Sequence, residues 1–196
     1  FDISNPESLE KIYKLWRQES EKHNKKENHN ISCENCTGEY LIQSKQCKNC
    51  FIVSKECQDL LYVYNAFPRL TDAQHSCYVG EDISVMYESI ASGAGGANVF
   101  FCNLCFNNPY NLFYCHYCVN TKNSFGSVGL RNNEYCILNK QYTKEEYFEI
   151  VPKIIKQMKQ NNEWGEFLHQ KYSPFGYNET TAHSVMPLNK NQAINK

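Results

Sequence analysis

Small residues recur in pairs three positions apart through the middle of the chain, and an apolar residue usually follows each pair. The clearest pairs are Cys33/Cys36, Cys47/Cys50, Cys102/Cys105, Cys115/Cys118 and Ser124/Ser127, and weaker ones are Cys57/Leu60, Gln74/Cys77, Ser89/Ser92 and Asn133/Cys136. Short runs of aromatic and β-branched residues follow most pairs, and residues 31–139 carry no helical stripe. This pattern predicts many short strands separated by tight turns.

Helical periodicity returns at both ends of the chain. Residues 5–22 place Leu9, Ile12, Tyr13 and Trp16 on one narrow apolar stripe, which we expect to pack against the main body and cover the first coil. A polar run from residue 22 to residue 30 predicts a solvated linker.

A second helix is predicted over residues 143–160. Thr143 and Glu146 have the spacing of a capping box, which satisfies two backbone N–H groups at a helix start. A stripe of five apolar residues is expected to cover the last coil: Tyr147, Val151, Ile154, Ile155 and Met158. Pro152 should kink this helix or restart it.

These elements divide the chain into four expected parts. Residues 1–30 form an N-terminal helix and linker, and residues 31–140 form the repeat domain. Residues 141–178 form a capping helix with an aromatic turn, and residues 179–196 form a flexible tail.

The cysteine pairs allow a metal-binding interpretation. Cys33, Cys36, Cys47 and Cys50 have the spacing of one zinc ribbon. Cys102, Cys105, Cys115 and Cys118 have the spacing of a second. Four thiolates suit tetrahedral Zn²⁺, so these eight residues are the candidate metal ligands if the protein carries zinc.

The same spacing continues where zinc has no ligand, and this favours a β-solenoid without a cofactor. Ser124 and Ser127 repeat the pair with hydroxyls, which bind zinc poorly, and Cys57, Cys77 and Cys136 have no correctly spaced partner. In a solenoid, small side chains stack inside successive coils, and cysteine is buried readily as a small hydrophobe. We therefore expect a mainly β, parallel β-helix-like solenoid with a helix at each end.

Charge and cysteine content narrow the classes of partner. The formal net charge is −1, and residues 31–139 contain six Lys and Arg against nine Asp and Glu. A nucleic-acid groove needs a basic stripe, so such a partner is disfavoured. Eleven cysteines cannot all pair internally, and no signal peptide or membrane-spanning run is visible. We therefore expect reduced thiols in a cytoplasmic protein without a membrane partner.

Long stretches of the second half resemble a family of uncharacterised proteins predicted from candidate-phylum bacterial genomes. The stretches are residues 123–147, Glu163-Trp-Gly-Glu-Phe167 and Ser173-Pro-Phe-Gly-Tyr-Asn-Glu179. The resemblance covers roughly residues 30–190 and implies a Cys/Asn-rich repeat region that follows a zinc-ribbon region with Cys-Pro-x-Cys pairs. This chain has no such pair, so it resembles the repeat half only. The resemblance implies no activity.

No cysteine, histidine or carboxylate forms a recognised catalytic signature, so we name no catalytic residue and expect a non-enzymatic protein. The first expectation for function is a structural or protein-interaction scaffold with a rigid, repetitive β face. The alternative is a zinc-ribbon module that binds nucleic acid or the ribosome. Six aromatic residues, if exposed together, would suit that alternative by stacking on bases: Phe101, Phe106, Tyr110, Phe113, Tyr114 and Tyr117.

Overall fold

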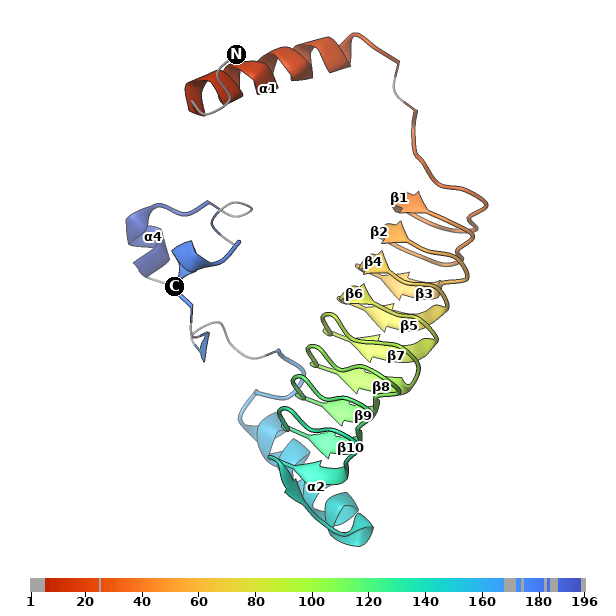
Figure 1. Ribbon diagram of the computed structural model, residues 1–196, viewed down its shortest axis with the longest axis vertical. Helices are drawn as coiled ribbons and strands as arrows, with labels where there is room; N and C mark the ends of the chain where they lie inside the picture. The colour runs from red at the N-terminus through yellow and green to blue at the C-terminus, as the bar shows by residue number, and fades with distance from the viewer. Residues whose placement is uncertain are drawn as a thin grey trace.

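The fold, seen in a computed structural model, is a parallel β-solenoid of about eight turns with a helix at each end (Figure 1). The residues that it describes are 6–24, 26–167, 172–173, 175–181, 183 and 187–194. The mainly β solenoid expected from the sequence is confirmed.

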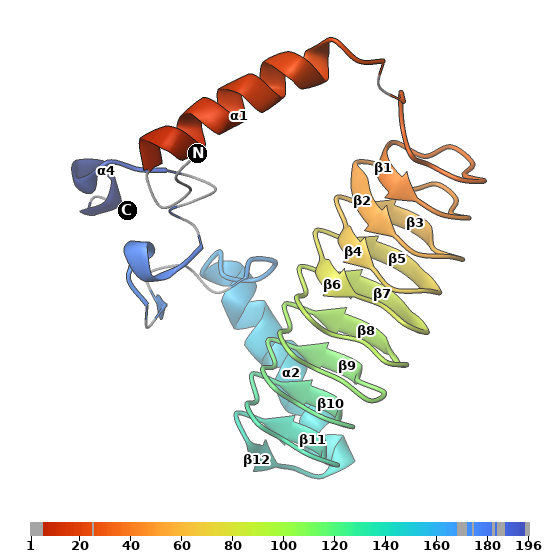
Figure 2. The ribbon, with the colours of Figure 1, turned by 45° about the horizontal axis from the view of Figure 1, so that its top comes forward.

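Short strands form two parallel sheets along the solenoid, of which the smaller covers only the first coils and the larger continues to the last coil (Figure 2). The smaller sheet contains β1 (Gly38–Leu41), β2 (Cys50–Val53), β4 (Tyr64–Ala66) and β6 (Cys77–Val79). The larger sheet contains β3 (Gln58–Leu61), β5 (Leu70–Gln74), β7 (Ile83–Tyr87), β8 (Ala97–Phe100), β9 (Tyr110–Phe113), β10 (Lys122–Phe125), β11 (Glu134–Ile137) and β12 (Lys140–Gln141). Only β12 runs antiparallel to its neighbour in these described sheets, and it ends the last coil.

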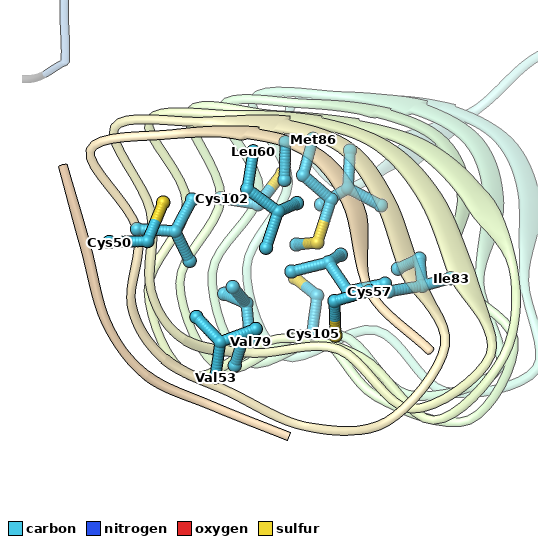
Figure 3. Packing of buried hydrophobic residues seen from close by; sticks show 14 of the residues in the cluster. Cys50, Val53, Cys57, Leu60, Val79, Ile83, Met86, Cys102 and Cys105 are labelled. Atoms are coloured by element: carbon cyan, nitrogen blue, oxygen red, sulfur yellow. The ribbon is translucent and has the colours of Figure 1, made fainter. Parts of the chain in front are cut away.

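Every third residue points into the solenoid. Leu41 stacks on Val53 of the next coil. Between these two residues in the sequence are three further inward residues, Ser44, Cys47 and Cys50, which are fully buried. Each coil therefore places four side chains in the interior. Figure 3 looks into this interior, where labelled cysteines lie among valine, leucine, isoleucine and methionine side chains.

This triplet geometry explains the paired cysteines. Residues three apart are consecutive inward positions of one coil, and both must be small enough to share a narrow interior. The sequence predicts this arrangement at all but one pair. Gln74 and Cys77 are outward, because the buried residues of that coil are Ala73, Ser76 and Val79. The prediction that Gln74 and Cys77 are an inward pair is therefore wrong by one residue.

The residue before an inward position usually has a positive φ, which bends the chain at each triplet. Asparagine is frequent there because its side chain tolerates the left-handed region better than most residues do. Asn98, Asn111 and Asn123 occupy one such row, and their amides donate from each coil to the next over 2.8 and 2.9 Å. The row ends where Asn123 donates to Glu134 over 3.0 Å. These hydrogen bonds help to offset the conformational cost of the left-handed backbone at the asparagines.

Helix α2 (Lys144–Gln160) covers the last coils. The capping box of Thr143 and Glu146 is present, as the sequence predicts. Tyr147 and Val151 are buried against Phe125 and Ile137, while Ile154, Ile155 and Met158 are half-buried around them. Pro152 lies inside this single helix, so of the two expected effects the restart does not occur, and the kink stays a prediction.

Helix α1 (Pro6–Glu21) does not cover the first coil. It stands apart from the solenoid (Figure 1), and Leu9, Tyr13 and Trp16 of its apolar stripe are exposed. The expectation that this stripe packs on the main body is therefore wrong.

The described residues that follow α2 include two short helices, η2 (Tyr177–Glu179) and α4 (Lys190–Ile194). The expected flexible tail, residues 179–196, lies partly outside the described residues. No helix in the described part of the chain is sufficiently long and apolar to cross a membrane.

Candidate functional site

One side of the solenoid carries a continuous row of aromatic rings. In-register residues of successive coils stack along this side: Gln74, Tyr87, Phe100, Phe113 and Phe125. The next position adds Tyr62, His75, Phe101 and Tyr114, while Glu88 occupies it in the coil of Tyr87. We call these nine residues, without Glu88, the aromatic face. It follows from the coil length, because side chains that are 12 or 13 residues apart become neighbours across one parallel pair.

The rings of the aromatic face contact one another from coil to coil. Tyr62 stacks on His75 at 5.3 Å between centroids, and Phe100 stacks on Phe113 at 5.2 Å. The rings of Phe101 and Tyr114 lie 4.6 Å apart and nearly parallel. Such pairs stabilise the fold by about 1 kcal/mol each beyond the burial of their area. The face is consequently a rigid surface as well as an apolar one.

The chain covers part of this face with its own C-terminal segment. The Trp164 ring lies 5.9 to 6.0 Å from the rings of Phe101, Phe113 and Tyr114. The backbone of the segment is also held, since Gly165 N donates to Tyr114 Oη over 3.2 Å. Phe167 N donates to Glu88 Oε2 over 3.0 Å. Side chains on the aromatic face thus bind a stretch of peptide backbone.

Beyond Trp164 the aromatic face is open and forms a groove of about 680 Å³. We call this the aromatic groove. Its walls are Asp72, Gln74, Val85, Met86, Tyr87, Phe100, Phe101, Phe113, Trp164 and Gly165. The volume falls within the range of binding sites for small molecules or for a few side chains.

Carboxylates give this groove a negative character. Burial raises the pKa of Tyr87, and the negative charges of Glu88 and Glu166 raise it further. Asp72 lies at one edge of the groove, and no lysine or arginine is among the described residues that line it. The site therefore favours a ligand with apolar and cationic parts.

The six aromatic residues proposed for base stacking do not share one surface. Phe101, Phe113 and Tyr114 lie on the aromatic face, where Trp164 packs on them. Phe106, Tyr110 and Tyr117 belong to other sides of the coil, because different inward residues flank each of them. Tyr62, His75, Tyr87 and Phe100 belong to the aromatic face but were not expected from the sequence, although aromatic residues spaced by one coil length are a signal of such a row.

The eight candidate zinc ligands all occupy inward positions of the solenoid. Cys102 and Cys115 stack in one column, and Cys105 and Cys118 stack in the next, since Asn103 pairs with His116 and Phe106 with Val119. All four are essentially fully buried. Cys47 and Cys50 are buried in an earlier coil. In the coil before it, Cys33 and Cys36 are half-buried, and the register places Cys36 over Cys47 but Cys33 over Ser44.

The buried thiols donate to backbone carbonyls, and the thiols of Cys102, Cys105, Cys115 and Cys118 also lie close enough to interact with one another. Cys102 Sγ donates to Phe100 O over 3.2 Å, and Cys118 Sγ donates to Ser127 O over 3.5 Å. Burial raises the pKa of Cys102 well above its usual range. Within the described ranges, no group of three or more His, Cys, Asp or Glu residues is arranged to hold a metal ion. Zinc binding by the eight cysteines stays a prediction.

Comparisons of this chain with protein-family models, with curated proteins and with solved structures found no match. The functional argument therefore depends on the chemistry of the aromatic face and the aromatic groove.

Proposed function

We propose that the protein is a non-catalytic scaffold that presents a rigid β-solenoid face to a protein partner. The observation that carries this proposal is the aromatic face, of which one part is covered by the chain's own Trp164 segment and the neighbouring part forms an open groove. Aromatic residues dominate the binding energy of protein interfaces when they are held in place before binding. The ring contacts between coils supply that rigidity.

The contacts of the C-terminal segment support a protein partner over a nucleic acid. Tyr114 Oη and Glu88 Oε2 accept hydrogen bonds from backbone N–H groups, which a partner peptide also offers. Phosphate groups offer no such donors, and the nearby carboxylates would repel them.

Site-specific photo-crosslinking tests this function. We would introduce benzoylphenylalanine at Gln74, in the aromatic groove, and at the exposed His116 on another side of the solenoid as the matched control. The expected result is a protein adduct at Gln74 that is absent at His116 and is lost when Tyr87 and Phe100 are changed to Ala. Adducts of equal yield at both positions, or adducts only to nucleic acid, would contradict the proposal.

A further inference from the structure

The aromatic groove combines two features that together select a chemical class of ligand. The partly exposed rings that line it include those of Tyr87, Phe100 and Trp164. Tyr87 and Trp164 each contact the buried ring of Phe101 edge to face, which holds them in place. The face of each ring carries a negative quadrupole, which attracts a cation placed over it.

Carboxylates lie beside these rings. Asp72 is exposed at the edge of the groove, and Glu88 is half-buried where it accepts the bond from Phe167 N. Both side chains would gain from a positive charge held near them, because charges close to an apolar wall are screened less than charges in open water. Among the described residues that line the groove there is no lysine or arginine to supply that charge.

The groove is also continuous with a peptide contact that the chain already makes. Trp164 and Gly165 form one wall of the groove, and Tyr114 and Glu88 hold the backbone on either side of that wall. A second extended segment that enters the groove would lie beside Trp164 and meet the same kind of acceptor. This continuity points to a peptide rather than to an isolated small molecule.

We propose that the aromatic groove binds an arginine- or lysine-bearing segment of the protein partner, with the cationic group held over the partly exposed ring of Tyr87 and beside Asp72 and Glu88. The proposal rests on the proposed scaffold function and names the chemistry of its partner. A neutral glycan would stack on the same rings but would leave the carboxylates without a counter-charge.

Titration with blocked amino acids tests this selectivity. N-acetyl-arginine methylamide is the cationic probe, and N-acetyl-citrulline methylamide is its uncharged analogue of nearly the same shape. The chain has two tryptophans, so a Trp16→Phe background leaves Trp164 as the only tryptophan, and its emission reports on the groove. We expect saturable binding of the arginine probe about fivefold tighter than that of the citrulline probe.

Two variants assign that preference to the carboxylates. Asp72→Asn combined with Glu88→Gln should remove most of it, while the new glutamine amide would keep an acceptor for Phe167 N. The matched control is Asp59→Asn, because Asp59 is also exposed and has a positive φ like Asp72, but it does not line the groove. That variant should bind the arginine probe like the parent.

Equal binding of the two probes, or tighter binding of cellobiose than of the arginine probe, would overturn the inference. So would an arginine preference that survives the double variant of Asp72 and Glu88. If the arginine probe fails while Gln74 still crosslinks to a protein, the cationic ligand is wrong and the scaffold function stands. If both experiments fail, the proposed function fails as well.

Discussion

Replacing Cys115 and Cys118 together by serine separates the solenoid from the zinc alternative. Both thiols are buried in the interior, in neighbouring inward columns. Both columns already accept serine, since the buried Ser89 lies two coils before Cys115 and the buried Ser92 lies two coils before Cys118. Ser89 Oγ donates to Tyr87 O over 3.1 Å, and a new hydroxyl at residue 115 can donate in the same way to Phe113 O.

The expected loss of stability is small, because each substitution replaces a thiol donor by a hydroxyl donor. A buried hydroxyl that keeps its hydrogen bond costs much less than an unpaired one, so we expect about 1 kcal/mol per site from lost apolar character and looser packing. The double variant should therefore lose about 2 kcal/mol of unfolding free energy. If the four thiolates bound structural zinc, the loss would approach the binding energy of the metal, which is about 10 kcal/mol or more.

Urea denaturation followed by circular dichroism, in reducing buffer with and without a chelator, measures the difference. We expect the double variant to unfold at lower urea, with curves that the chelator does not shift and with substoichiometric zinc in the purified parent. Ser89→Cys is the reverse control and should be nearly neutral. Loss of the folded baseline in the double variant, or tightly bound zinc whose removal unfolds the parent, would refute the reasoning.

Three further predictions test other parts of the molecule. Val151→Asp places a charge against the last coil and should lower the unfolding free energy by about 3 kcal/mol and cause oligomers in light scattering. The control Lys156→Asp, on the exposed side of α2, should do neither. A monomeric, equally stable Val151 variant would show that the helix packs elsewhere. Asn111→Ala removes two side-chain hydrogen bonds at a residue whose φ is 52°, and a thermal melt should show a loss of about 2 kcal/mol of stability. Asn111→Gly keeps the backbone freedom and should lose less. Equal losses would deny the backbone contribution. Filter binding with mixed single strands at about 0.15 M salt should show at most weak binding, and sub-micromolar binding that disappears on changing Tyr114 and Tyr117 to Ala would support the nucleic-acid alternative.

Local spacing was sufficient to predict the solenoid. Cys102/Cys105 and Ser124/Ser127 share one spacing although only the first pair could bind zinc, and both prove to be inward positions. The asparagines that precede inward residues, such as Asn123 before Ser124, were a further signal, because they mark the left-handed turns. Gln74 and Cys77 imitated the spacing on the outer surface, where it carries no meaning for packing.

The sequence by itself determined the triplet of inward small residues, the interchange of cysteine with serine, and the capping box of α2, because each of these depends on residues a few positions apart. The tertiary structure decided which residues become neighbours across coils. The coil length changes along the solenoid, since Gly38 pairs with Cys50, Phe51 pairs with Tyr64 and Lys122 pairs with Glu134. The stacking of side chains therefore depends on every coil length before them. Trp164 reaches the ring of Tyr114 from fifty residues away, and no local pattern contains that contact. The aromatic groove exists because the chain folds back onto a face that the stacked coils build.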